Sequence, residues 1–461
     1  MPYQNEFAHY KPLRRVAESA EVQGLLKRMK SRHTSSSAPV TSPSVSLANL
    51  KPSGWVPDFV LAIDGSEAEV PVKNGYPLAA VGYVTVASVL LDVAKMIKLD
   101  AQRPVDPKEF RKIENAESID SALPTTNVVI DGELYTVASF RRALFELLSS
   151  KRMSDDGESL LETYEALLKE KPTPDRQRCP FEDCFFPPEK GYQRGQGVYN
   201  CGCPYNRPLF STDALRIHES MKPDSSNISA LTQVISVLEK LWFIHFLRTL
   251  EKEKLLPVLQ RMAIVIDGPL AVFDDPAWLS TIIRKELHRL NEEARKAIRD
   301  DRFDLLILGI EKSGAFVEHF TEIDKGPNGE MDFLPRQTAI LLTDDYIKQK
   351  IIFSNSDREY GRNTYFGRKI LYKAKSGALI VATTPFLNED HSDIKRADVD
   401  QFPRLADAMN LLDKLVSARY RNSVTPIISA HAEAAIPLNL GKRVLEQLAR
   451  QLMATVTNGK P

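Results

Sequence analysis

The sequence has few cysteines, no long apolar run and no net charge. Its 461 residues include only four cysteines, and its 61 basic residues balance its 61 acidic residues. So few cysteines exclude a disulfide scaffold, and the charge balance excludes the overall basic excess of a histone-like binder, although a local basic groove is compatible with it. The longest uncharged apolar run, Tyr76 to Leu91, is shorter than the ~20 residues of a membrane-spanning helix. The N-terminus is charged without an apolar core, so we expect no signal peptide, no membrane association and a cytoplasmic location.

Several common catalytic signatures are also missing. The sequence contains no GxxxxGK(S/T) and no GxGxxG after a strand, which excludes a P-loop and a dinucleotide fingerprint. It contains neither a GxSxG elbow nor an HExxH zinc motif. An aspartyl-nucleophile phosphatase needs a second Asp two residues after the first, and Ser66 occupies that position after Asp64. Among the classes of function, these absences leave catalysis by carboxylate-bound metal ions or a protein without catalytic activity.

Apolar strands alternate with amphipathic helices along most of the chain. The 43% hydrophobic and 26% charged fractions are typical of a folded globular protein, and the length indicates two or three domains. Short apolar runs predict buried strands, and 3.6-residue spacing predicts helices. The strands are expected at 59–63, 70–72, 79–89, 262–266, 305–310 and within 335–385, and the helices at 138–149, 158–169, 231–250, 279–299 and 440–453. Strands interleaved with helices predict an α/β fold with a mixed sheet.

The chain is expected to contain a core interrupted by an insertion. A helical arm (1–33, with helical spacing from Leu13 to Lys30) and a Ser/Thr/Pro-rich flexible linker (34–50) precede it. The core comprises 51–100 and 227–461, separated by an insertion over 101–226 that contains the cysteine cluster 179–203.

Three Ile-Asp-Gly triplets end apolar runs, at Asp64, Asp131 and Asp267. Asp-Gly between apolar runs is a common hairpin signal, and we interpret Asp131 as such a turn. Asp64 and Asp267 each end a more fully apolar strand, which is expected in the middle of the sheet. Two such strand ends can bring both carboxylates within reach of one cation, as two-metal phosphodiester hydrolysis by Mg²⁺ or Mn²⁺ requires.

A third carboxylate ligand should come from a helix beside the sheet. Glu239 lies close to the apolar face of the predicted helix at 231–250, and Glu219 is the alternative. Glu239 would otherwise be a rim residue that pairs with nearby lysines.

Four short segments resemble the NurA nuclease family and occur in the family's order. They are Ala62-Ile63-Asp64-Gly65-Ser66, Ile266-Asp267-Gly268-Pro269-Leu270, Gly309-Ile310-Glu311-Lys312-Ser313 and Ser429-Ala430-His431-Ala432. The resemblance covers the chain from about 56 to 450. It implies an RNase H-like fold that acts on DNA ends with Mn²⁺ or Mg²⁺. It also implies a homodimer that works with the hexameric HerA translocase ATPase, in DNA repair or antiphage defence.

The resemblance assigns roles to individual residues. Asp64, Glu239 and Asp267 would be carboxylate metal ligands, and His431 the C-terminal metal or proton-transfer residue. Lys312 would hold a phosphate. Without the resemblance, His431 would be a packed or capping residue and Lys312 an ordinary exposed lysine. The family's tyrosine shortly before this histidine is missing, and the nearest is Tyr420.

All the cysteines fall within one stretch that is rich in Pro and Gly: Cys179, Cys184, Cys201 and Cys203. Four thiolates can close a tetrahedral structural Zn²⁺ site in a segment too small to form a core of its own. The spacing differs from the usual paired CxxC, and disulfides are the alternative. No open catalytic position is indicated.

A further group of basic and aromatic residues could track a DNA backbone and stack on bases. Its members are Lys312, Arg362, Arg368, Lys369, Tyr360, Tyr365 and Phe366. The alternative is that these residues pack a sheet. At the level of function, the alternatives are a non-catalytic RNase H-like scaffold that binds nucleic acid and an ATPase, and an RNA-directed nuclease of the same fold.

Overall fold

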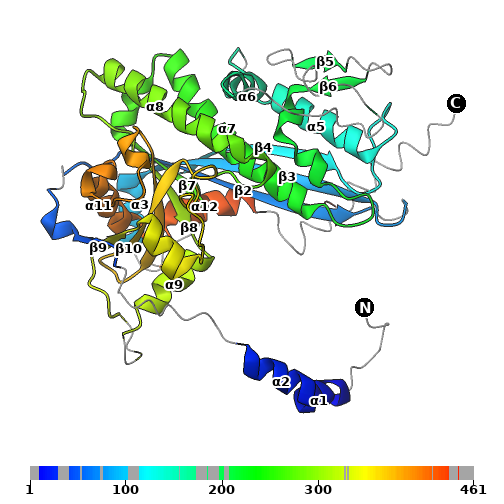
Figure 1. Cartoon of the computed structure of the whole chain (residues 1–461). Coiled ribbons are helices and arrows are strands. Elements are labelled where there is room, and N and C mark those ends of the chain that lie inside the picture. The colour runs from blue at the N-terminus through cyan, green and yellow to red at the C-terminus, as the bar shows by residue number, and fades with distance from the viewer. Residues whose placement is uncertain are drawn as a thin grey trace. The chain divides into compact units, whose positions relative to one another are not determined.

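In a computed structural model, the chain divides after Thr41 into two units (Figure 1). The structure describes residues 10–29, 41–51, 54–72, 76–101, 114–154, 156–172, 184, 197–201, 207–326, 329, 332–417, 419–435 and 445. The first unit contains two helices, α1 (Tyr10–Glu18) and α2 (Ala20–Arg28), rather than the continuous helix predicted from Leu13 to Lys30. They break at Ser19, whose hydroxyl caps α2 by accepting a hydrogen bond from the Val22 amide.

A nine-stranded mixed sheet forms the centre of the second unit, and the predicted α/β fold is confirmed. Its order is β1-β9-β10-β11-β8-β7-β2-β3-β4. The strands are β1 (Ser44–Ser46), β9 (Thr338–Leu341), β10 (Gly367–Lys373), β11 (Leu379–Pro385), β8 (Ile307–Glu311), β7 (Met262–Asp267), β2 (Phe59–Pro71), β3 (Ala80–Asp92) and β4 (Glu114–Pro124). Strand β7 pairs in parallel with β2 and β8, whereas β2, β3 and β4 form an antiparallel meander. This succession of β4, β3, β2, β7 and β8 is that of an RNase H-like sheet.

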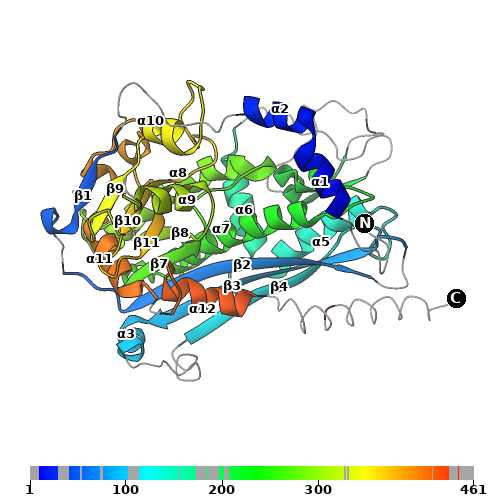
Figure 2. The ribbon, with the colours of Figure 1, turned by 90° about the horizontal axis from the view of Figure 1, so that it is seen from below.

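Helices cover both faces of this sheet (Figure 2). Helices α7 (Ile228–Lys252) and α8 (Trp278–Ile298) lie on one face, and α11 (Leu405–Leu415) and α12 (Thr425–Ala434) on the other. Successive side chains of β2 point to opposite faces of the sheet. Leu61 and Ile63 enter the core with α7. On the other face, Val60 packs with α11 and Ala62 packs with α12. Neighbouring residues of β2 therefore face different helical layers. The remaining elements include α3 (Val93–Ala101), α5 (Thr136–Ser150), α6 (Leu160–Lys169), α9 (Ala315–Ile323), α10 (Asp344–Tyr346), β5 (Val198–Asn200) and β6 (Pro208–Phe210).

Helix α7 is the one helix of the described residues that is long and apolar enough to cross a membrane. Its most apolar 18-residue window is 83% buried within the protein. It crosses the meander and packs against α6 and α8, so it is a core helix.

The strand end expected at Asp64-Gly65 and the hairpin expected at Asp131 are both absent. Strand β2 continues through Asp64-Gly65 to Pro71, because β3 pairs with it over its whole length. Asp131 does lie in a turn, but no strands flank it, and α5 begins at Thr136. The run from Val128 to Ile130 makes no ladder with a neighbour, so no hairpin forms there.

Two boundary predictions also change. The linker expected over 34–50 ends earlier, because β1 pairs antiparallel with β9 and the side chain of Leu47 is buried in the core. Residues 114–124, which we assigned to the insertion over 101–226, form β4 and belong to the central sheet. The helix expected over 440–453 lies outside the described residues apart from Leu445.

Candidate active site

Asp64 is a buried carboxylate in the middle of β2. It lies one residue beyond Ile63, which makes the last pairing of β2 with β7, and its side chain is on the face that carries α12. It is 1% exposed. His431 Nδ1 lies 3.0 Å from Asp64 Oδ2 and Lys312 Nζ lies 3.4 Å from the same oxygen. Asp64 therefore contacts both His431 and Lys312, and it lies within β2 rather than at the end of a strand.

Asp267 and Lys312 come from the ends of the two neighbouring parallel strands. Asp267 is the last residue of β7, and Lys312 follows the last residue of β8. Because parallel strands end at the same edge of a sheet, both side chains arrive beside Asp64. Lys312 Nζ lies 3.0 Å from Asp267 Oδ1, so its ammonium bridges the two aspartates.

Glu239 approaches from the opposite face of the sheet, through a gap left by Gly65. A Cβ at Gly65 would lie 2.9 Å from Glu239 Oε1 and 2.6 Å from Ile235 Cγ2. The missing side chain lets α7 approach β2 closely, so the buried Glu239 carboxylate reaches the backbone beside Asp64. Lys240 Nζ, which is also buried, lies 2.7 Å from Glu239 Oε2.

Burial and neighbouring carboxylates raise the pKa values of Asp64 and Glu239. Burial, followed by Asp267, raises the pKa of Asp64 to about 8; Lys312 opposes the shift and Glu239 adds to it. Burial also raises the pKa of Glu239, against the lowering effect of Lys240, and Asp267 again contributes. Three negative groups crowded in a low-dielectric site would each gain from a bound cation.

The donor set fits a hard divalent cation. Carboxylate oxygens are the ligands that Mg²⁺ and Mn²⁺ prefer, and the Lys312 ammonium already lies between Asp64 and Asp267 as a cation would. No three His, Cys, Asp or Glu side chains of the described residues are gathered closely enough to form a ready-made metal site. Asp64, Asp267 and Glu239 are the residues that could hold one.

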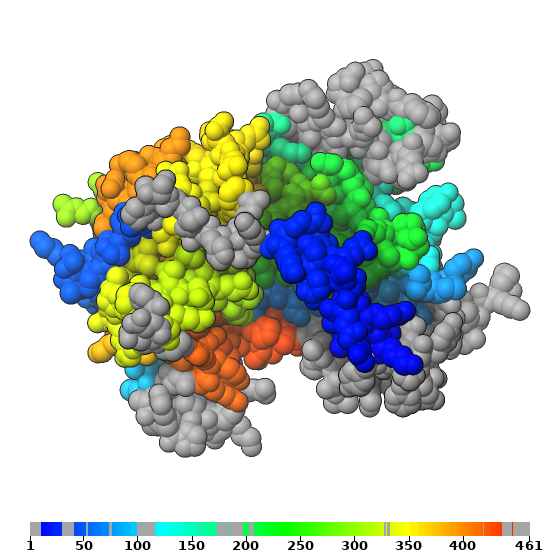
Figure 3. Space-filling view, turned by 60° about the horizontal axis from the view of Figure 1, so that its bottom comes forward, coloured from blue at the N-terminus to red at the C-terminus, as the bar shows by residue number. Residues whose placement is uncertain are grey.

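His431 is tied to Asp64 but remains accessible. Helix α12 lies at the surface in Figure 3 (orange-red), and its Ala430 packs against Ala62 on β2. The His431 side chain is 60% exposed. A ring anchored by one nitrogen and open to solvent can meet a substrate.

One family model matches most of the chain. The family model described as the NurA domain matches residues 59–436. The chain belongs to the NurA family. NurA is a nuclease family, and the matched region contains all four residues that surround Asp64. No curated protein matches the chain.

Two solved NurA structures are similar to this chain at low identity. The crystal structure of the NurA nuclease from Sulfolobus solfataricus is 11% identical, covers 91% of this chain and 89% of that one, and gives a TM-score of 0.34. A crystal structure of NurA with manganese is 10% identical, covers 96% of each chain, and gives a TM-score of 0.24.

Some predicted residues lie elsewhere in this NurA-family chain. Glu219 makes a two-oxygen ion pair with Arg216, at 2.6 and 2.9 Å, and is not among the groups that shift the pKa of Asp64. The exposed Tyr420 lies against the Arg419 guanidinium, 5.2 Å from its ring centre. Neither residue therefore joins the cluster around Asp64.

The predicted DNA-tracking surface is wrong for three residues. Arg368, Lys369 and Phe366 are buried, because β10 is an inner strand between β9 and β11. Lys369 forms an ion pair with Glu311 instead of facing solvent.

The cysteine cluster is described only in part. The Sγ atoms of Cys184 and Cys201 lie 3.6 Å apart, longer than the ~2.05 Å of a disulfide bond. Cys179 and Cys203 lie outside the described residues.

Sequence reasoning missed Gly65 and Lys240. Gly65 was assigned to a turn, and its close contact with α7 becomes evident only when the helix is placed on the sheet. Lys240 follows Glu239 directly in a helix that is apolar elsewhere, and a lysine at such a position could have been recognised as a buried partner.

Proposed function

We propose that this chain is a metal-dependent deoxyribonuclease that hydrolyses phosphodiester bonds at a site formed by Asp64, Glu239 and Asp267, with Mn²⁺ or Mg²⁺. The observation that carries the proposal is the position of Asp64 and Asp267 on either side of Lys312, with Glu239 close enough to raise the pKa of Asp64, in a chain of a nuclease family. Two divalent ions held by Asp64, Glu239 and Asp267 would supply an activated water and electrostatic stabilisation of the leaving oxygen.

The side chains around the carboxylates have separate roles in the proposed reaction. Lys312 is 32% exposed and bridges two aspartates, so its ammonium is free to turn to a substrate phosphate once a cation takes over the carboxylates. His431 keeps its Nδ1 on Asp64, which leaves Nε2 to hold or deliver a proton at the leaving oxygen. Lys240 keeps Glu239 oriented toward Gly65.

The family resemblance supports a proposal about the substrate and the partners of the chain. We propose that the chain processes DNA ends as a cytoplasmic homodimer together with a HerA-type hexameric ATPase, in DNA repair or antiphage defence. The helices α1 and α2 are the candidate docking element, since both expose apolar residues: Leu13 and Val16 on α1, Leu25 and Leu26 on α2.

Digestion of linear single- and double-stranded DNA with Mn²⁺, Mg²⁺ or EDTA tests the nuclease, with and without the ATPase. Asp64→Asn is expected to lower the cutting rate by at least about a hundredfold, because it removes a charged ligand. Asp131→Asn is the matched control: it changes the exposed aspartate of the third Ile-Asp-Gly triplet and should cut like wild type. Equal loss in both variants, or cutting that survives EDTA, would contradict the mechanism.

The second candidate is a non-catalytic scaffold that binds nucleic acid and the ATPase. The missing tyrosine before His431 favours it. Its signature is DNA binding without cutting under any metal, even with the ATPase present.

A structural Zn²⁺ at Cys179, Cys184, Cys201 and Cys203 is a separate proposal. The 3.6 Å between the Cys184 and Cys201 sulfurs supports it, because two thiolates at ~2.3 Å from a tetrahedral zinc lie at about this separation. Metal analysis should find one zinc per wild-type chain and none in Cys184→Ser. A zinc-free wild-type protein would exclude the site.

A further inference from the structure

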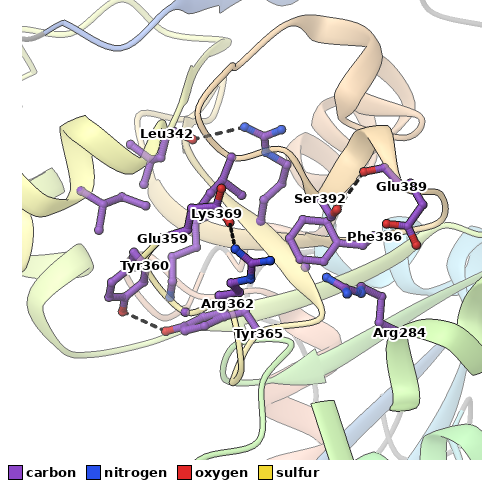
Figure 4. A pocket seen from close by; sticks show the side chains of 15 residues that line it. Arg284, Leu342, Glu359, Tyr360, Arg362, Tyr365, Lys369, Phe386, Glu389 and Ser392 are labelled. Carbon is purple, nitrogen blue, oxygen red and sulfur yellow. Dashed lines mark hydrogen bonds and ion pairs between the residues drawn. The ribbon is translucent and has the colours of Figure 1, made fainter. Parts of the chain in front are cut away.

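A cavity lies beside β10, apart from the carboxylates. Its volume is about 160 Å³. Its wall includes Arg284 from α8, Tyr360 and Arg362 from the loop before β10, and Tyr365, Arg368 and Lys369 at the start of that strand (Figure 4). Strands β11 and β8 separate β10 from β7, where Asp267 lies, so this cavity is distinct from the proposed nuclease site.

Positive charge in this cavity is incompletely balanced. Lys369 is neutralised by Glu311, and Arg362 pairs loosely with Glu359 at 3.7 Å. Arg284 is half-buried, yet its guanidinium makes no hydrogen bond or ion pair with the described residues. A partly desolvated guanidinium without a partner is costly, so this position is suited to an anion.

Arg368 adds a second guanidinium with a spare donor. Its terminal nitrogens donate to backbone carbonyl groups of Arg396 and Leu342, whereas its buried Nε has no partner among the described residues. Burial lowers the pKa of Arg368 to about 10, so it stays protonated at neutral pH.

Two phenols complete the donor set. The Tyr360 and Tyr365 hydroxyl oxygens lie 3.1 Å apart and form a hydrogen bond. One of the two hydroxyl groups donates to the other, so the accepting hydroxyl keeps a proton that it can donate to a ligand. Burial raises the pKa values of both phenols, so they remain protonated donors. Figure 4 shows Arg284 and Arg362 reaching toward this space from different elements, and Glu359 and Glu389 also line it.

We propose that this cavity binds a phosphate monoester, the terminal phosphate of a nucleotide or of a DNA strand. Guanidinium forks match phosphate oxygens, and the three arginines that line this one space favour a dianionic monoester over a diester. A cavity of about 160 Å³ admits a phosphoryl group but not a nucleoside, so the sugar would lie outside.

Calorimetric titration of the full chain tests the site. The titration is done in EDTA, in which a metal-dependent nuclease does not cut the probes. The probes are thymidine 5′-monophosphate, a short 5′-phosphorylated oligothymidylate and the same oligomer with a 5′-hydroxyl. Arg284→Gln and Arg362→Gln are expected to weaken binding of the phosphorylated probe by roughly tenfold or more. Lys285→Gln, which removes the exposed charge next to Arg284 on α8, should bind like wild type.

The outcomes separate the sources of the phosphate. Binding of both the nucleotide and the phosphorylated oligomer supports a free-nucleotide site, and binding of the phosphorylated oligomer alone supports a DNA end. Equal affinity for the hydroxyl oligomer, or unchanged affinity in both arginine variants, would overturn the proposal. None of these results depends on whether the chain cuts DNA.

Discussion

At the scale of single residues, Gly65 controls how closely Glu239 approaches Asp64. A methyl group there would meet Ile235 Cγ2 at 2.6 Å and Glu239 Oε1 at 2.9 Å, so α7 would have to move away from β2. We expect Gly65→Ala to lower the free energy of unfolding by about 1–3 kcal/mol, as overpacking does. If Glu239 is a metal ligand, metal-dependent cutting should fall as well. Urea unfolding and the digestion assay measure the two effects.

Gly24→Ala is the control for that substitution. A methyl group on Gly24 in α2 meets nothing within 4 Å, and alanine favours the helix. Its stability should equal or slightly exceed that of wild type. A Gly65→Ala protein as stable and active as this control would show that the contact with α7 is unimportant.

At the scale of elements, His245 on α7 links the stability of the helical layer to pH. Its Nδ1 lies 2.8 Å from Thr163 Oγ1 on α6, its Nε2 is buried without a partner among the described residues, and burial lowers its pKa to about 4. Folding therefore favours the neutral ring. The unfolded chain takes up a proton near pH 6.5 and the folded chain only near 4, so stability is lost as the pH falls between these values.

We expect this one group to cost about 2 kcal/mol of unfolding free energy between pH 7 and pH 5. Other groups titrate in the same range, so the comparison is with His245→Gln, which cannot take up the proton. Urea unfolding at both pH values should give a smaller acid loss in the variant. An identical loss in the two proteins would rule out the role of His245.

At the scale of the whole molecule, the boundary between arm and body lies before β1. A chain that begins at residue 41 keeps β1 on the edge of β9 and Leu47 in the core, whereas one that begins at 51 loses both. We expect the first truncation to leave the melting temperature unchanged and the second to lower it by roughly 5 °C, because a strand and a buried leucine are lost.

The same truncations test the docking proposal. Removal of residues 1–40 should abolish co-purification with the ATPase while metal-dependent cutting persists. Association that survives this deletion would exclude α1 and α2 as the docking element.

Patterns within short segments were enough to predict most elements and to single out residues that the fold brings together. The apolar run at 262–266 and the helical spacing at 231–250 correspond to β7 and α7, because each pattern reflects burial of a local stretch. The four motif segments identified Asp64, Asp267, Lys312 and His431, which the fold brings into contact.

Only the tertiary structure decided what surrounds those residues. Asp-Gly has the same local signal in a turn and in a strand, and pairing with β3 over the full length of β2 makes it a strand at Asp64. Lys369 is charged, and its burial follows from β9 and β11 on either side and from Glu311 across the sheet. Side-chain type is a local property, whereas burial and the choice of partner depend on residues far away in the chain. These distant residues determine the pKa of Asp64 and leave the Arg284 charge without a partner among the described residues.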